Sequence, residues 1–114
     1  MITGLRGDVV IVRTSGELDL VSAPGFRVRM AEAIALHTPP CVVIDTADLT
    51  FCDSTGLSVL AGALNAIEAA GGRLAISGVH GQLARILKIT GLDKKFRIHS
   101  TIDSAVKHLI ETED

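Results

Sequence analysis

The sequence contains few aromatic side chains and no excess of positive charge. Over its 114 residues there are three Phe, no Trp and no Tyr, and the formal net charge is -2. Proteins that bind nucleic acids hold the phosphates with clustered Lys and Arg and stack bases on aromatic rings. We therefore expect no nucleic acid as the main ligand.

Cysteine is also scarce, since Cys41 and Cys52 are the two thiols of the chain. They do not form a C-x-x-C pair, and no histidine stands beside them at the spacing of metal ligands. This excludes a zinc site and a disulfide scaffold, and two isolated thiols suit a reducing compartment. We expect neither a metal nor a cofactor.

Long apolar runs are missing, although 47% of the residues are hydrophobic and the mean hydropathy is +0.42. Purely apolar runs such as Val9–Val12 and Cys41–Ile44 are far shorter than the roughly 20 residues that span a membrane as a helix. The N-terminus lacks the basic and apolar regions of a signal peptide. We expect a cytoplasmic protein with no membrane contact, folded as one domain over residues 1–114.

Short apolar runs predict the strands of a buried sheet, because continuous runs suit strands that helices cover on both faces. Gly7-Asp8 separates the first run from an earlier short strand that starts near Met1, which predicts a hairpin. The segments 15–19 and 45–53 carry mixed polar residues, and we expect loops there. The remaining strands are expected over residues 9–12, 41–44, 73–77 and 96–98.

Apolar side chains that recur every three or four residues predict helices between the strands. In the first helix Phe26, Met30 and Ala33 share one face, Ser22 is a candidate N-cap, and Pro39-Pro40 prevents continuation. Further helices are expected over residues 54–70, 82–89 and 102–110. The pattern predicts an α/β layer sandwich with a mixed, mostly parallel sheet of about five strands and about four helices.

Because many activities occur on such a fold, function has to be argued from a site. The carboxyl ends of parallel strands share one edge of a sheet, so we expect Gly16–Asp19 and Asp45–Gly56 to be neighbours. At this edge Asp53-Ser54-Thr55-Gly56 opens a helix. Either Ser54 or Asp53 caps that helix and does nothing more, or the Ser54 hydroxyl accepts a phosphate that the positive helix end helps to hold.

A phosphate on Ser54 would add about -1.5 to -2 charges beside Asp53 and near Asp19. At a separation of about 6 Å and an effective dielectric near 20, each pair of like unit charges costs roughly 3 kcal/mol. The helix end returns about 0.3–2 kcal/mol. The repulsion and the helix-end stabilisation together should leave the fold largely unchanged. A partner that covers the surface must in addition desolvate a dianion. We therefore expect the phosphate to switch binding and not folding.

Other constellations favour ordinary structural roles. Ser54 lies in no G-x-S-x-G motif, and the four His are scattered along the chain, which argues against a hydrolase. The segment Gly78–Gly81 matches no phosphate-binding loop, so we expect a turn and a helix start. Cys52 is either an oxidation sensor or a small buried apolar residue, the usual role of a free cysteine.

Several motifs, taken in order, resemble the STAS-domain anti-sigma factor antagonists of the sporulation and stress-response type. They extend over nearly the whole chain, and the resemblance implies a single STAS-like layer sandwich. The motifs are Gly16-Glu17-Leu18-Asp19, Val42-Val43-Ile44-Asp45 with Asp48-Leu49-Thr50-Phe51, Asp53-Ser54-Thr55-Gly56-Leu57, and Gly71-Gly72 with the later Ile89-Thr90-Gly91-Leu92.

The resemblance also implies a mode of action. In such proteins the serine after the motif aspartate, here Ser54, is phosphorylated by a serine kinase that is also the anti-sigma factor. Unphosphorylated antagonist binds this ATP-dependent kinase and frees the sigma factor, the phosphorylated form is released, and a PP2C-type phosphatase resets it. The chain would be a bacterial regulator without catalysis of its own. Its implied partner-binding residues are Asp19, Asp53, Ser54, Thr55 and Gly56.

Two positions depart from the family pattern. Thr55 stands where many relatives have a second Ser, and its hydroxyl is a competing candidate acceptor. Cys52 stands where a bulkier apolar residue is usual. The alternative reading within the resemblance is a STAS interaction module that is never phosphorylated and serves a lipid-transport or stress-sensing complex.

Overall fold

The computed structural model describes residues 2–111, so Met1 and residues 112–114 lie outside the described part. None of the described helices is long and apolar enough to cross a membrane. The elements in chain order are β1 (Ile2–Arg6), β2 (Val9–Leu18), α1 (Ala23–Ala35), β3 (Cys41–Cys52), α2 (Ser54–Ala69), β4 (Arg73–Ser77), α3 (Gly81–Thr90), the short 3-10 helix η1 (Leu92–Lys94), β5 (Arg97–His99) and α4 (Ile102–Glu111).

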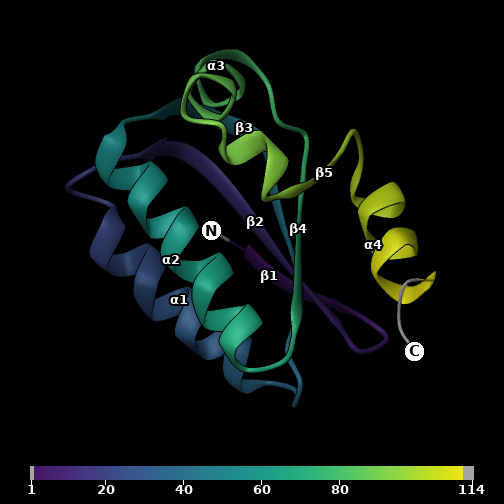
Figure 1. Ribbon diagram of the computed structural model, residues 1–114. Helices are drawn as coiled ribbons and strands as arrows, with labels where there is room; N and C mark the ends of the chain where they lie inside the picture. Colours follow the sequence, from purple (N-terminus) through teal and green to yellow (C-terminus); the bar gives the residue numbers. More distant parts are fainter. Residues whose placement is uncertain (1, 112–114) are drawn as a thin grey trace.

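The five strands form one mixed sheet in the order β1-β2-β3-β4-β5. The hairpin partners β1 and β2 are antiparallel, and every later pair is parallel. In Figure 1 the helices α1 and α2 lie side by side over one face of the sheet, and α4 covers the other face. The predicted mixed, mostly parallel α/β sandwich with five strands and four helices is confirmed.

The central strands are buried on both faces, as their continuous apolar runs predicted. Val10 and Val12 belong to the core cluster that α1 and α2 complete, with Phe26 and Leu60 among its buried members. Val9 and Ile11 belong to the second cluster, which α4 completes. Successive side chains on a strand point to opposite faces. One apolar run therefore supplies both cores.

Two predicted loops were wrong, because β2 continues to Leu18 and β3 continues to Cys52. Polar residues that suggested a loop have hydrogen-bond partners on neighbouring strands. The buried Asp45 carboxylate accepts from the Ser77 hydroxyl at 2.9 Å, and Thr46 donates to the Ser77 carbonyl at 2.9 Å. Buried polar groups are tolerated when they are paired in this way. The last strand also begins one residue later than expected, at Arg97.

The turn between α2 and β4 is packed against the segment that precedes β3. A side-chain carbon on Gly72 would lie 2.0 Å from the Pro40 carbonyl oxygen, which is held in place by a 2.9 Å hydrogen bond from the Arg73 amide. Backbone cannot move aside as a flexible side chain can. A glycine is therefore required at this position.

We expect Gly72→Ala to destabilise the fold by about 2 kcal/mol, the usual cost of forcing extra atoms into a packed site. Gly62→Ala is the matched control, because the added carbon at that helical position meets no atom within 4 Å. Alanine should stabilise α2 there by about 0.5–1 kcal/mol. Urea unfolding followed by circular dichroism measures both, and equal effects of the two variants would contradict the packing argument.

Candidate functional site

Strands β2 and β3 extend together beyond the rest of the sheet. The described pairing of β1 with β2 ends at Arg13, and that of β4 with β3 ends at Asp45, whereas β2 and β3 remain paired as far as Leu18 and Cys52. We call residues 14–18 and 46–52 the ribbon. Its far end leads into Asp19 on one strand and into Asp53-Ser54 on the other. The predicted juxtaposition of these two segments is confirmed.

Asp53, and not Ser54, caps α2. Its Oδ1 accepts a hydrogen bond from the Gly56 amide at 2.9 Å, and its own amide donates to the Leu18 carbonyl at 3.3 Å. Ser54 is the first residue of the helix and is exposed. Within residues 2–111 no hydrogen bond engages its hydroxyl. Asp53 therefore fills the capping role that was one interpretation of the motif, and the Ser54 hydroxyl is not needed for it.

Gly56 lets the first turn of α2 lie directly against the ribbon. A side-chain carbon there would be 2.2 Å from the Leu18 carbonyl oxygen and 2.9 Å from the Cys52 sulfur. The close approach therefore requires glycine. Thr55, next to it, is half-buried, which leaves Ser54 as the more accessible hydroxyl of the pair.

Asp19 organises the turn between β2 and α1. Its Oδ1 accepts from the amides of Val21 and Ser22, at 3.0 Å each. Ser22 occupies the N-cap position of α1 but its side chain does not cap the helix, contrary to expectation. Its hydroxyl instead donates to the Glu17 carbonyl at 2.8 Å and accepts from the Asp19 amide at 2.9 Å. The Ser22 side chain therefore stabilises the end of β2 and does not cap α1.

The end of the ribbon is acidic. Glu17 and Asp48 lie on it, and Asp19 and Asp53 follow its two strands. Among the described residues the ion pairs are Arg6–Asp103 and Lys107–Glu111, so none of these four carboxylates is neutralised by a salt bridge. A further negative group introduced here would meet repulsion from these carboxylates.

Cys52 is fully buried beside this site. Burial, with a smaller effect of the nearby Asp53 charge, raises the pKa of its thiol to about 11. The thiol is therefore protonated at neutral pH, and oxidation proceeds through the thiolate. The environment of Cys52 is that of a small buried apolar residue.

Three exposed apolar side chains beside the acidic end were not predicted as site residues. Leu20 is 73% exposed, Val21 88% and Phe51 36%. We call these three residues the apolar rim. Their signal in the sequence was weak, since isolated apolar residues occur in many loops. Leu20 and Val21 directly follow Asp19, and Phe51 lies opposite Glu17 on the ribbon. Exposed apolar groups bordered by polar residues are typical of a surface that binds another protein.

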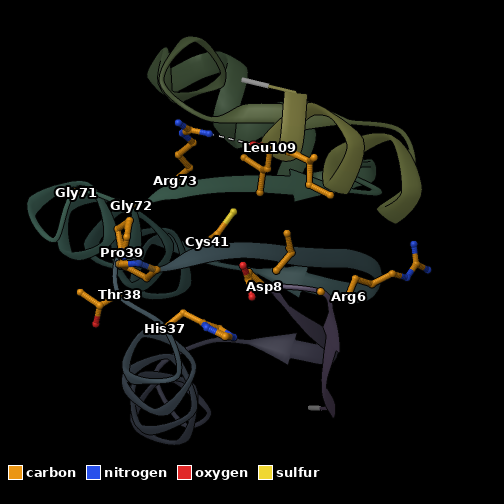
Figure 2. A pocket seen from close by; sticks show the side chains of 14 residues that line it. Arg6, Asp8, His37, Thr38, Pro39, Cys41, Gly71, Gly72, Arg73 and Leu109 are labelled. Atoms are coloured by element: carbon orange, nitrogen blue, oxygen red, sulfur yellow. Dashed lines mark hydrogen bonds between the residues drawn. The ribbon is translucent and has the colours of Figure 1, made fainter. Parts of the chain in front are cut away.

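A cavity of about 430 Å³ lies elsewhere, at the amino ends of the parallel strands. Figure 2 shows Arg73 on its wall donating to the Leu109 carbonyl, at 3.0 Å. Arg6, on another wall, pairs with Asp103. Both cations therefore attach α4 to the sheet, and none of the predicted site residues lines this cavity. No cluster suited to a metal ion occurs among residues 2–111.

Comparison with known proteins places this arrangement in a family. The STAS domain model matches residues 3–105. The anti-sigma F factor antagonist of Paenibacillus polymyxa is 37% identical over 105 residues, covering 92% of this chain and 87% of that protein. An anti-sigma factor antagonist from Mycobacterium paratuberculosis has a crystal structure that matches with a TM-score of 0.85 at 29% identity, over 95% of this chain and 91% of the other.

A third comparison concerns the fold alone. The Bacillus cell fate determinant SpoIIAA in its phosphorylated form matches with a TM-score of 0.73 at 22% identity, over 94% of this chain and 96% of that one. This structural likeness is consistent with the match to the family model, which spans most of the chain. By its sequence and its fold, this chain belongs to the STAS domain family.

Proposed function

We propose that this chain is an anti-sigma factor antagonist gated by phosphorylation of Ser54. In its unphosphorylated form it binds an anti-sigma factor serine kinase and so frees the sigma factor. The observation that carries the proposal is the exposed Ser54 hydroxyl at the start of α2, left unused by the cap that Asp53 makes. Relatives named as anti-sigma factor antagonists and the phosphorylated form of SpoIIAA support it.

The hydrogen bonds at the start of α2 determine how a phosphate is accommodated. Asp53 already occupies the amides of Gly56, through its side chain, and Leu57, through its carbonyl. The Ser54 and Thr55 amides remain for the phosphate, so the helix end offers it about 0.3–2 kcal/mol. The nearby carboxylates oppose it at roughly 3 kcal/mol per unit pair at a distance of about 6 Å. The phosphate therefore extends into solvent.

A partner bound over this surface feels the change more strongly than the fold does. Covering the ribbon end after phosphorylation removes water from a dianion that lies among carboxylates without salt bridges in the described residues. Each 1.4 kcal/mol of mismatch lowers affinity about tenfold. Release of the kinase is the expected consequence, and a PP2C-type phosphatase restores binding by removing the phosphate.

The chemistry of transfer belongs to the partners. The kinase binds ATP and contributes the catalytic groups, and this chain contributes the acceptor hydroxyl and the docking surface. A hydrolase built on Ser54 would need a histidine base, and within residues 2–111 no hydrogen bond joins the Ser54 hydroxyl to a histidine. We therefore assign no catalytic residue and no cofactor to the chain.

The first prediction concerns the modified residue. Incubated with its cognate anti-sigma kinase and ATP, the protein should gain one phosphate, which peptide mass spectrometry should place on Ser54. Ser54→Ala should abolish incorporation, and Thr55→Val should retain it because Thr55 is half-buried. Phosphate found on Thr55 alone would show that Thr55, and not Ser54, is the acceptor. Complete absence of phosphate would favour a STAS module that binds its partner constitutively.

Charge at the acceptor should control affinity. We expect Ser54→Asp to weaken kinase binding at least about tenfold, because it adds a carboxylate to an unneutralised acidic surface. Ser54→Ala should bind as the wild type does. Asn65→Asp is the control, since it adds the same charge at an exposed position further along α2. Isothermal titration calorimetry measures all three, and equal affinities for the two Ser54 variants would refute charge gating.

The apolar rim should contribute binding energy without contributing to the fold. We expect Leu20→Ser to lower kinase affinity about tenfold or more, as truncation of an interface anchor commonly does, with an unchanged Tm. Ile110→Ser is the matched control, because Ile110 is 55% exposed on α4, away from the ribbon. Loss of affinity in both variants alike would show that Leu20 has no special place in the interface.

A further inference from the structure

The outer edge of β3 in the ribbon has no described strand beside it. The pairing of β4 with β3 ends at Ser77 opposite Asp45, and β3 continues for another seven residues, 46–52. Backbone amides and carbonyls at such an edge still need hydrogen-bond partners where they are shielded from water. The partners at this edge come from side chains at the start of α3.

Two residues at the start of α3 take the place of a strand. The His80 ring forms a hydrogen bond of 2.9 Å with the Ala47 carbonyl, and Gln82 Oε1 accepts from the Cys52 amide at 3.3 Å. Because a carbonyl only accepts, His80 Nε2 must carry the proton. One contact fixes the beginning of the overhanging segment and the other fixes its end. Figure 1 shows α3 above the end of β3 in agreement with these bonds.

The turn that leads into α3 is itself held tightly. Gly78 has a φ of +70°, and a side-chain carbon on it would lie 2.9 Å from the Ala47 amide nitrogen. Its own amide donates to the His99 carbonyl at 3.1 Å. The sequence Gly78–Gly81, which matched no phosphate-binding loop, forms the predicted turn and helix start. It sets His80 and Gln82 against β3.

Gln82 acts on the residue that leads into the acceptor site. Cys52 is followed by Asp53, which caps α2, and then by Ser54. On the opposite side the Asp53 amide is held by the Leu18 carbonyl at 3.3 Å. The backbone before Ser54 is therefore fixed from two directions, by β2 and by α3. Kinases need the acceptor hydroxyl in a defined geometry, because positioning supplies much of the rate of phosphoryl transfer.

We propose that Gln82 is a positioning residue for the phosphorylation of Ser54, with His80 fixing the other end of the same strand edge. The α3 start thereby controls how well the acceptor is presented to the kinase. This inference rests on the proposed function. It differs from a purely structural role for Gln82, which would change stability and leave the turnover of folded protein unaltered.

The experiment compares Gln82→Met with wild type in kinetics and in hydrogen exchange. Methionine keeps the length of the side chain and removes the acceptor oxygen, and Gln82→Glu restores an acceptor at the same reach. With the cognate kinase and ATP, we expect kcat for Ser54 to fall about fivefold in Gln82→Met, the effect of one lost hydrogen bond. Gln82→Glu should recover kcat, although its charge raises KM.

Amide exchange by NMR reports on the clamp without the kinase. The Cys52 amide should exchange about fivefold faster in Gln82→Met than in wild type, and Asn65→Met, an equivalent change on exposed α2, should alter neither readout. If Gln82→Met does not fold, Gln82→Ala replaces it, since alanine leaves room for water at the amide.

The outcomes separate the two proposals. A wild type that gains no phosphate on Ser54 overturns the proposed function and this inference with it. A phosphorylated wild type with an unchanged kcat in Gln82→Met overturns the inference alone, whatever the Tm. A fall in kcat together with faster Cys52 exchange, both reversed in Gln82→Glu, supports it.

Discussion

The parallel pairing of β2 with β3 is the interaction on which the rest of the site depends. Its register, with Leu18 opposite Cys52, brings the ends of two distant chain segments together at one edge of the sheet. The Leu18 carbonyl then receives the Asp53 amide, and the absence of a side chain on Gly56 lets α2 begin against the same carbonyl. A shift in this register would displace the acidic end and Ser54 together.

Such an extension of two strands beyond their neighbours leaves two sheet edges, and edges are open to unwanted pairing with other chains. Here the starts of two helices supply local partners. Ser22, at the start of α1, donates to the Glu17 carbonyl on the β2 edge, and Gln82, at the start of α3, accepts from the Cys52 amide on the β3 edge. Each side chain replaces part of a missing strand, so the ribbon is held without lengthening β1 or β4.

Much of the fold could be predicted from the sequence, because short apolar runs and helical periodicity report burial directly. The extents of β2 and β3 could not, since Asp45 and Thr46 find their partner in Ser77, 32 and 31 residues away. The motif Asp53-Ser54-Thr55-Gly56 was visible as a helix start, but which of its residues makes the cap depended on side-chain geometry. Gln82 belongs to no motif, and its contact with Cys52 arises from how α3 packs. The apolar rim could not be predicted either, because single apolar residues in predicted loops are common and do not by themselves indicate a binding surface.

The tight seat of Gly56 also limits how this surface can diversify. A larger residue in place of Gly56 would collide with the Leu18 carbonyl. The identity of this residue is therefore set by packing within the protein, whatever partner binds outside. The capping Asp53 is similarly tied to the helix that it starts. A lineage that needs several antagonists, each faithful to one kinase, must therefore vary the exposed positions around this fixed centre. Leu20, Val21 and Phe51 are exposed there, so on the proposed function partner identity would be encoded beside the Asp53-Ser54-Thr55-Gly56 motif and not within it.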